Sequence, residues 1–319
     1  MRRHLVIGGT SGIGRAIAKE LIDRKEEVSV LVRNKSKADK YYQDLPSVNI
    51  IQGDASKSAD IENAISDKEI VYYCINIPYH HWNKEAKPLL YTSMNAAIKS
   101  KSRFIFPGNV YVYGHAQTIT VKESHPQDSH TRKGKLRIEM ERMLKTAEDE
   151  EGLDYLIIRM PDFYGPYVIN GYSEKVFTNA LQGKTIHWYG DIDVTIEFIF
   201  IEDAAKAMVT AALTNKPGRE FNVPGSSLTT PREFLSEVAN QAWKGSKVKA
   251  NNSGMLVSLA GIFSPLIREF KEMMYLKQER FVLDGTVYKS TFGMLPSTPY
   301  KDGIKKTLRW AKNFYGIKA

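Results

Sequence analysis

The chain has 319 residues and 42% hydrophobic content, enough for one large α/β domain with a smaller lobe, and this excludes a disordered chain. Its single cysteine, Cys74, excludes a disulfide framework and a cysteine-based zinc site, and its apolar surroundings predict a buried, inert thiol. The net charge of +9 would suit an anionic partner, but basic and acidic residues are interspersed, so neither nucleic acid nor a membrane surface is the expected partner.

No targeting or membrane-spanning segment is predicted. The first apolar run, at 5–7, is too short for a signal peptide. The longest, at 255–267, falls short of the roughly 20 residues that cross a bilayer. We therefore expect a cytoplasmic protein in which 255–267 forms a core or interface helix.

The N-terminus carries a pattern typical of a dinucleotide-binding turn. A strand predicted at 5–7 leads into a glycine-rich turn, and a helical pattern follows at 13–24. A pyrophosphate must approach the backbone closely at the start of a helix, where the first N–H groups lack partners, so glycine is needed there. The residues expected to contact the cofactor are Gly8, Thr10, Ser11, Gly12, Ile13 and Gly14.

Strands and helices then alternate, which predicts repeated βα units. Because the strands are nearly uninterrupted apolar runs, both of their faces should be covered, as in a doubly wound parallel sheet of the Rossmann type. Ligands of such a sheet bind at the carboxyl ends of the strands. Further strands are expected at 28–32, 48–51, 70–75, 104–106 and 155–158, and further helices at 59–66, 84–100 and 136–147.

After about residue 167, the alternation of strands and helices gives way to short elements separated by glycine and proline. We predict a dinucleotide-binding domain at 1–166 and a smaller substrate lobe at 167–319, with strands near 195–201 and 220–223 that could return to the main sheet. A last helix is expected at 301–315. The polar and aromatic residues expected to line a pocket of the lobe are Tyr167, Tyr172, Trp188 and Arg219.

The end of the second strand indicates which cofactor is preferred. An acidic residue there would hydrogen-bond a ribose 2′-hydroxyl and repel a 2′-phosphate, but this strand ends in Arg33, Asn34 and Lys35. A guanidinium can stack on adenine and pair with a phosphate, so Arg33 favours NADP(H) over NAD(H). The alternative is a solvated arginine at a strand exit.

Five further segments, in order, resemble the extended branch of the short-chain dehydrogenase/reductase superfamily, the NAD-dependent epimerase/dehydratase-like proteins. The glycine turn differs slightly, since its spacing is that of the superfamily's short branch. The resemblance runs nearly end to end and implies that Asp54 and Ala55 lie at the adenine and Pro161 at the nicotinamide. The segments are Gly53–Ala55, Asn109–Gly114, Ile158–Pro166, Phe198–Ala205, and Phe221–Pro224 with Thr229–Phe234.

The resemblance also implies a catalytic Tyr-x-x-x-Lys pair and a Ser or Thr, and here this chain departs from the pattern. Lys135 is present, but Thr131 stands in place of the tyrosine and Asn109 in place of the serine. A threonine hydroxyl is too weak an acid to relay a proton near neutral pH. Lys135 could still hold the nicotinamide ribose, and the Asn109 amide could donate to a substrate carbonyl.

Other side chains could supply the missing acid or contact the substrate. Tyr111 is the first candidate; an extended loop would place it and Tyr113 on the same side as Asn109, although packing is the expected role of Tyr113. A loop after the fourth strand offers imidazoles that titrate near pH 6.5. No metal site is expected. The residues predicted to face the substrate are His80, His81, Trp82 and Tyr164, with His115 a weaker candidate for the acid.

Three functions remain open at this point. The first, which we favour, is an NADP(H)-dependent oxidoreductase or nucleotide-sugar epimerase-like enzyme that acts on a small-molecule substrate with a nonstandard acid. The second is a catalytically silent dinucleotide-binding sensor or scaffold. The third is an RNA-binding member of the family, supported only by net charge. The resemblance further implies a homodimer through the helices at 84–100 and 136–147, although both segments carry many charged residues.

Overall fold

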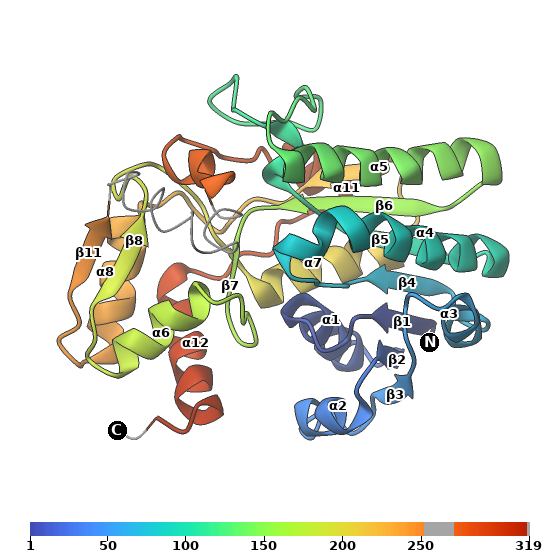
Figure 1. Ribbon diagram of the computed structural model, residues 1–319, viewed down its shortest axis with the longest axis horizontal. Helices are drawn as coiled ribbons and strands as arrows, with labels where there is room; N and C mark the ends of the chain where they lie inside the picture. The colour runs from blue at the N-terminus through green and yellow to red at the C-terminus, as the bar shows by residue number, and fades with distance from the viewer. Residues whose placement is uncertain (252–270, 318–319) are drawn as a thin grey trace.

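The computed structural model describes residues 1–251 and 271–317, so the helix expected at 255–267 lies outside the described residues. Within the described ranges, no helix is long and apolar enough to cross a membrane. Figure 1 shows a main body built on a central sheet and a smaller lobe beside it.

The central sheet has seven parallel strands in the order β10-β6-β5-β4-β1-β2-β3. The order reverses beside β1, so the helix that follows β1 begins at the switch point where a ligand binds in such sheets. The predicted doubly wound α/β fold is confirmed. The strands are β1 (Arg3–Ile7), β2 (Glu27–Val32), β3 (Asn49–Gln52), β4 (Ile70–Tyr73), β5 (Arg103–Asn109), β6 (Tyr155–Met160) and β10 (Glu220–Asn222).

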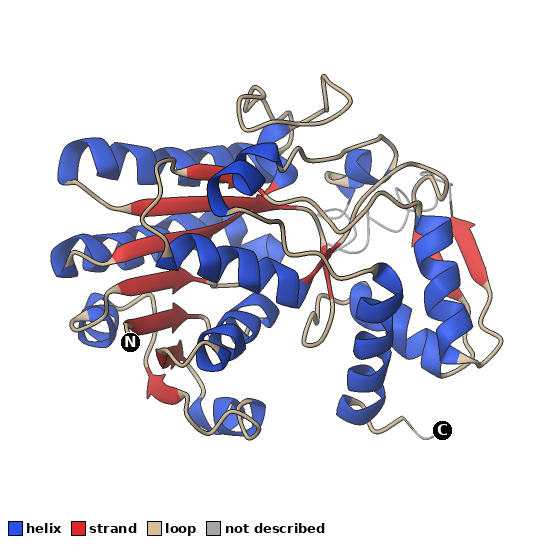
Figure 2. Ribbon diagram, turned by 180° about the vertical axis from the view of Figure 1, so that it is seen from behind, coloured by secondary structure: helices blue, strands red, loops and turns tan. Residues whose placement is uncertain are grey.

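Helices cover both faces of this sheet, as Figure 2 shows from behind. Successive residues of a strand point to opposite faces, so Val6 packs in one apolar cluster and Leu5 in the other. One face is covered by α1 (Gly12–Asp23), α2 (Lys35–Tyr41), α7 (Ile201–Leu213) and α11 (Thr286–Phe292), and the other by α3 (Ser58–Ile65), α4 (Trp82–Ser100) and α5 (Arg132–Glu151).

The second half of the chain contributes to both parts of the molecule. The strand expected near 220–223 is β10, which joins the main sheet beside β6, and α7 packs along α1. The strand expected near 195–201 does not return to that sheet, because β9 (Ile199–Phe200) pairs with β7 (Phe163–Tyr164). The lobe contains α6 (Ser173–Leu181), β8 (Ile186–Tyr189), α8 (Pro231–Ala242), β11 (Val248–Asn251), the 3₁₀ turn η3 (Met274–Lys277) and α12 (Tyr300–Phe314).

A buried carboxylate ties the lobe to the segment that leads back to the body. Glu197 is only 5% exposed, and it accepts the backbone N–H groups of Leu283 at 2.8 Å and of Gly225 at 3.1 Å. Burial raises the pKa of Glu197 to about 7, although the two N–H donors oppose the shift. Above that pH the buried carboxylate is charged, and this lowers the free energy of unfolding.

This cost predicts a pH-dependent stability. The pKa of Glu197 is higher in the folded than in the unfolded chain, so stability falls as pH rises from the unfolded pKa through the folded one. We expect Glu197 to lower the free energy of unfolding by about 3 kcal/mol across that window. Urea unfolding at a series of pH values should show this slope in the wild type and in Glu202→Gln, an exposed control, but not in Glu197→Gln. Equal slopes in all three proteins would contradict the assignment.

Candidate functional site

The glycine-rich turn joins β1 to α1 at the carboxyl edge of the sheet. Ser11 caps the helix, since its Oγ accepts the N–H of Gly14 at 3.1 Å. Within the described residues, no acceptor is found for the backbone N–H groups of Gly12 and Ile13. Two free amides at the positive end of a helix form an anion-binding site, which fits a dinucleotide pyrophosphate.

The glycines of this turn are also required by the protein itself. Gly8 has a φ of +83°, and a Cβ there would lie 2.6 Å from the carbonyl oxygen of Cys74, which is buried as predicted. A Cβ on Gly12 would lie 2.8 Å from the carbonyl oxygen of Tyr167. The loop at 165–168 therefore packs directly on the turn, a reason for glycine that adds to the predicted approach of a phosphate.

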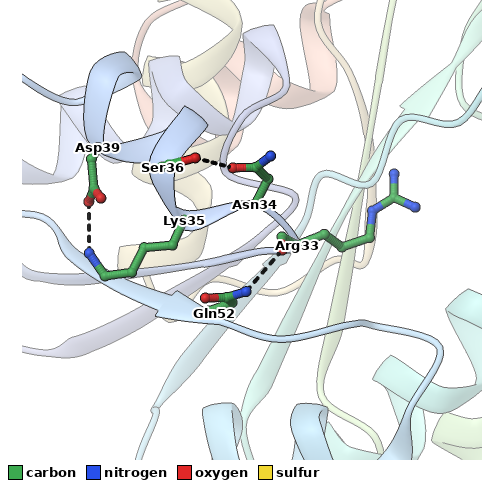
Figure 3. Close-up of a pocket in the computed structure, with 6 residues that line it drawn as sticks. All are labelled: Arg33, Asn34, Lys35, Ser36, Asp39 and Gln52. Atoms are coloured by element: carbon green, nitrogen blue, oxygen red, sulfur yellow. Dashed lines mark hydrogen bonds and ion pairs between the residues drawn. The ribbon is translucent and has the colours of Figure 1, made fainter.

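A polar hollow of about 480 Å³ opens beside the turn, at the end of β2. Arg33 reaches away from α2, whereas Lys35 folds back onto Asp39 at 2.8 Å (Figure 3). The side chain of Asn34 caps α2 by accepting the N–H of Lys37. The one carboxylate of the hollow is thus paired with a lysine, and the guanidinium of Arg33 is exposed to bind an anion. The lining residues are Arg33, Asn34, Lys35, Ser36, Asp39 and Gln52.

Asp54 lies in the turn after β3, at the carboxyl edge of the sheet. One oxygen of its carboxylate accepts the N–H and the hydroxyl of Ser56, both at 2.9 Å. The backbone N–H of Ser56 lowers the pKa of Asp54, and the charge of Arg33 contributes to the shift. The second carboxylate oxygen has no hydrogen bond within the described chain. The neighbouring Ala55 is buried.

The start of α5 carries Thr131, the residue expected at the position of the family tyrosine. Thr131 is the N-cap of the helix and is only 3% exposed; its Oγ1 accepts the N–H of Gly134 at 3.0 Å and lies 3.0 Å from the hydroxyl of Ser129. A Cβ on Gly134 would lie 1.8 Å from that hydroxyl oxygen and 2.5 Å from the carbonyl oxygen of Tyr111. The prediction of a catalytic role for Thr131 is wrong, because its hydroxyl is buried and committed to capping.

Lys135 lies one helical turn beyond Thr131, and its side chain is exposed. Its ammonium forms no hydrogen bond or ion pair with any described residue. It lies on the exposed stripe of α5, with Arg132 and Glu139, near the start of that helix.

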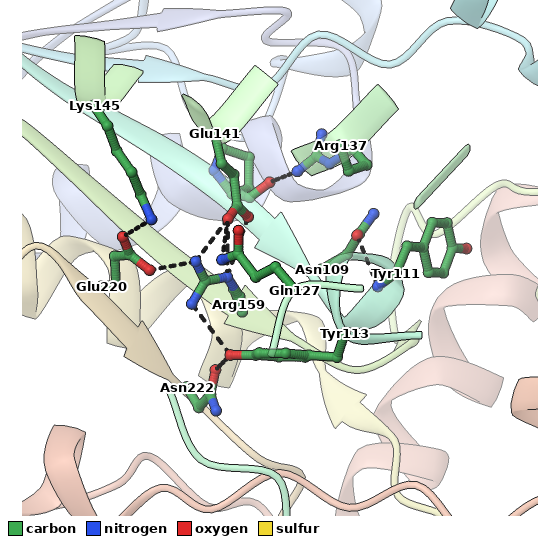
Figure 4. A network of polar contacts seen from close by, with 11 residues as sticks. Asn109, Tyr111, Tyr113, Gln127, Arg137, Glu141, Lys145, Arg159, Glu220 and Asn222 are labelled. Atoms are coloured by element: carbon green, nitrogen blue, oxygen red, sulfur yellow. Dashed lines mark hydrogen bonds and ion pairs between the residues drawn. The ribbon is translucent and has the colours of Figure 1, made fainter. Parts of the chain in front are cut away.

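The segment after β5 forms a 3₁₀ turn, η2 (Val110–Tyr113), so the alternation expected of an extended loop does not apply. Asn109 caps this turn by accepting the N–H of Tyr111 at 3.1 Å through Oδ1, which leaves its NH₂ group as a donor. The ring of Tyr113 points into a polar network, whereas that of Tyr111 points the other way (Figure 4). The phenol of Tyr111 lies 3.0 Å from that of Tyr79 in the 3₁₀ turn η1 (Tyr79–His81).

Tyr111 is poorly suited to relay a proton by itself. It is 8% exposed, and burial raises the pKa of its phenol well above the ordinary value, with further increases from Tyr79 and Asp162. The nearby charge of Arg137 also interacts with Tyr111 but does not outweigh these effects, since the net shift is upward. Tyr111 therefore remains a neutral hydrogen-bonding group at neutral pH.

The network that receives Tyr113 is centred on the buried guanidinium of Arg159 on β6 (Figure 4). Arg159 pairs with Glu141 of α5 at 2.6 Å and with Glu220 of β10, and it donates to the phenol oxygen of Tyr113 at 3.1 Å. That phenol donates in turn to Asn222 at 2.7 Å. Burial raises the pKa of Tyr113 to about 12, so its role is structural, as expected.

The three candidate histidines lie at the surface. His80 and His81 are exposed in η1, and Nδ1 of His81 lies 2.5 Å from Glu85. Trp82 begins α4, donates to the carbonyl of Ile77 at 3.0 Å, and stacks edge-on with Tyr79. His115 pairs with Glu279 at 2.7 Å. The described residues contain no group of three or more potential metal ligands.

Three residues singled out in the sequence, Tyr164 for the substrate and Tyr167 and Arg219 for a pocket of the lobe, are engaged in packing and ion pairs. Tyr164 is 2% exposed and packs against Phe200 and Phe234 in the lobe core, so its predicted substrate role is wrong. Arg219 forms ion pairs with Glu148 and Asp154 where β10 begins, away from the carboxyl edge. Tyr167 lies over the guanidinium of Arg15, 3.9 Å from its carbon atom to the ring centroid. These side chains are occupied by packing and ion pairs.

Two predicted lobe residues meet a cation that the sequence analysis missed. The ammonium of Lys277 lies 4.2 Å from the ring centroid of Trp188 and 5.0 Å from that of Tyr172. Burial lowers the pKa of Lys277, and the charge of Asp162 opposes that shift. Asp162 immediately follows Pro161, which is buried at the end of β6. Neither Lys277 nor Asp162 belongs to a recognisable sequence pattern, although Asp162 lies inside one of the quoted segments.

Comparison with known proteins decides the family. Residues 4–224 match the NAD dependent epimerase/dehydratase family. The chain belongs to that family. The predicted resemblance is thus confirmed, and the match extends through β10, past the start of the lobe.

Two relatives of this epimerase/dehydratase family member align over nearly its whole length. It is 23% identical to a UDP-N-acetyl-alpha-D-glucosaminuronate decarboxylase from Bacillus cytotoxicus, over 97% of each chain. It is 21% identical to a dTDP-glucose 4,6-dehydratase from Shigella flexneri, over 96% of this chain and 91% of that one.

Solved structures share the fold at low identity. The structure of a UDP-glucuronic acid 4-epimerase from Bacillus cereus in complex with NAD aligns with a TM-score of 0.81 and 17% identity, over 99% of both chains. A UDP-glucose 4-epimerase from Thermotoga maritima with UDP-glucose aligns with a TM-score of 0.77 and 20% identity, over 98% and 99% of the two chains.

The capping role of Thr131 can be tested by substitution. We expect Thr131→Ala to lower the free energy of unfolding by about 1 kcal/mol, because the N–H of Gly134 loses its acceptor. Thr131→Ser, which keeps the hydroxyl, should stay within about 0.5 kcal/mol of the wild type. Thr131→Tyr should lose the cap and create no new activity, because its ring would have to occupy a buried position. Urea unfolding measures the first two effects, and a gain of turnover in Thr131→Tyr would contradict the third.

Proposed function

We propose that this protein binds NADP(H) and transfers hydride between that cofactor and a hydroxyl or carbonyl carbon of a small substrate, a nucleotide sugar or a related compound, without the usual tyrosine. The observation that supports this most directly is the pair of free amides at the start of α1, next to a hollow whose exposed charge is the guanidinium of Arg33. A dinucleotide with an additional phosphate matches both features.

In this proposal, a different residue or group of residues binds each part of the cofactor and substrate. The amides of Gly12 and Ile13 hold the pyrophosphate, Arg33 binds the 2′-phosphate, and Asp54 keeps one oxygen for the adenine end. Lys135 holds the nicotinamide ribose, and the NH₂ group of Asn109 donates to the substrate oxygen. The bound cofactor supplies hydride transfer at its nicotinamide ring.

The nucleotide-sugar part of the proposal comes from the relatives. The decarboxylase, the dehydratase and the two epimerases are all named for UDP- or dTDP-linked sugars. The solved epimerase from Bacillus cereus holds NAD, so the preference for NADP(H) is a specific expectation for this chain and depends on Arg33.

A silent dinucleotide-binding protein is the second candidate. The observation that favours it is the burial of Thr131 at the tyrosine position, which removes the family's usual proton relay. Such a protein would bind the cofactor with the same residues and show no turnover. RNA binding gains no support, because several surface lysines pair with neighbouring carboxylates, including Lys19, Lys87 and Lys99.

Cofactor binding tests the proposal without knowledge of the substrate. Titration calorimetry should give a dissociation constant for NADPH at least 10-fold below that for NADH. Arg33→Ala should weaken NADPH binding roughly 10- to 100-fold, since a charge-assisted contact is lost, and leave NADH binding unchanged. Lys37→Ala is the matched control, because it removes a nearby exposed charge that does not line the hollow.

The outcomes separate the parts of the proposal. Equal binding of both cofactors would contradict the role of Arg33, and no binding at millimolar concentration would contradict the dinucleotide site. Reduction of NADP⁺ in the presence of UDP-glucose, UDP-glucuronic acid or dTDP-glucose would establish the enzyme; binding without reduction by this panel would favour the silent protein.

A further inference from the structure

A carboxylic acid that the family resemblance did not single out, Asp162, lies at the carboxyl edge of the sheet. In the register of β5 and β6, Asn109 lies opposite Met160, so Pro161 and Asp162 leave the sheet directly beside the cap of η2. The backbone carbonyl of Asp162 accepts the N–H of Ile199 at 3.1 Å, which fixes the position of this residue. Its side chain is exposed.

The carboxylate of Asp162 is close to groups from three separate segments. Its charge acts on the phenols of Tyr79 in η1 and Tyr111 in η2, and on the ammonium of Lys277 in η3. Within the described residues, it forms neither a hydrogen bond nor an ion pair. A carboxylate that is unpaired within the described residues, and that interacts electrostatically with two phenols and an ammonium at the ligand-binding edge of the sheet, is available to a substrate.

The two phenols complement such a carboxylate. Their oxygens lie 3.0 Å apart, so one phenol donates its proton to the other and the second retains an O–H to donate elsewhere. Both are shielded from solvent and stay protonated near neutral pH, because burial raises the pKa of each. The pair can donate one hydrogen bond to a substrate oxygen but cannot remove its proton.

We infer that Asp162 is the catalytic residue that exchanges the proton with the substrate hydroxyl, in place of the family tyrosine, while the Tyr79–Tyr111 pair orients the same oxygen. This inference rests on the proposed function. In the oxidation, the O–H bond breaks and its proton passes to the carboxylate of Asp162. The C–H bond breaks, and its hydride passes to the oxidised nicotinamide; the electron pair of the O–H bond forms the second C–O bond of the carbonyl. The substrate loses two electrons, and the cofactor gains them.

The site supports this assignment over the other candidates for the proton. Thr131 is buried and bonded at the N-cap, and Tyr111 is held neutral. His81 pairs with Glu85 at the surface. Asp162 is exposed at the edge where the cofactor turn also opens.

The first test compares Asp162→Asn with the wild type in NADP⁺ reduction, with UDP-glucose, UDP-glucuronic acid and dTDP-glucose as probes. General-base catalysis contributes about 10²- to 10⁴-fold, so kcat should fall at least 100-fold while KM and the dissociation constant for NADPH change less than threefold. Asp149→Asn, at an exposed position of α5, is the matched control and should keep full activity. A variant Asp162→Asn with kcat within threefold of the wild type would overturn the assignment and leave the proposed function standing.

The second test needs no turnover. In protein labelled with ¹³C at tyrosine Cζ, the signals of Tyr79 and Tyr111, assigned from Tyr79→Phe and Tyr111→Phe, should shift together as the carboxylate of Asp162 is protonated in acid. They should not shift in Asp162→Asn. Absence of this shift in the wild type would place the carboxylate too far from the phenols and overturn the inference. If the shift is present but no probe is turned over, the proposed enzymatic function fails and the catalytic role of Asp162 fails with it.

Discussion

The guanidinium of Arg159 is the contact on which the site depends. It lies buried on β6 and bonds to carboxylates of α5 and β10 and to the phenol of η2. Burial opposes the charge, but the paired carboxylates more than compensate and raise the pKa of Arg159. Four segments, of which α5 and β6 are consecutive while η2 and β10 are distant in the chain, are thereby held together, and η2, α5 and β6 adjoin residues of the candidate site.

The same arrangement leaves no room for a large side chain near the start of α5. The N-terminus of α5 approaches η2 so closely that only glycine fits at position 134, and the hydroxyl of Thr131 is consumed in capping the helix. A small, buried capping residue and a large, accessible phenol are alternative uses of one position. This chain uses the position for helix stability, and the available acids lie in the loops after β5 and β6.

At the glycine-rich turn, in contrast, the candidate binding groups belong to the backbone. The amides of Gly12 and Ile13 have no acceptor in the part of the chain that the structure describes, and the turn is tightly confined by Cys74 on one side and by Tyr167 on the other. The candidate binding groups of the turn are thus backbone atoms confined by packing, whereas Arg33 is an exposed side chain at the end of β2. Rigid amides cost little entropy on binding, and a single exposed cation can be changed without loss of the fold.

The sequence by itself determined the parts of the protein that depend on local pattern. The apolar runs and the glycine spacing predicted the doubly wound sheet and the turn after β1, because strand burial and close backbone approach leave direct marks on residue type. The helix at 35–41 was missed because only Ala38 of it is buried, so it has no apolar stripe. The tertiary structure alone decided the rest. It showed that Thr131 is a helix cap and that Tyr164 and Arg219 are engaged in packing and ion pairs. It also brought Asp162, Tyr79 and Lys277 to one edge of the sheet. The proximity of residues 79, 111, 162 and 277 depends on how the chain crosses the sheet, so it leaves no signal in any local stretch of sequence.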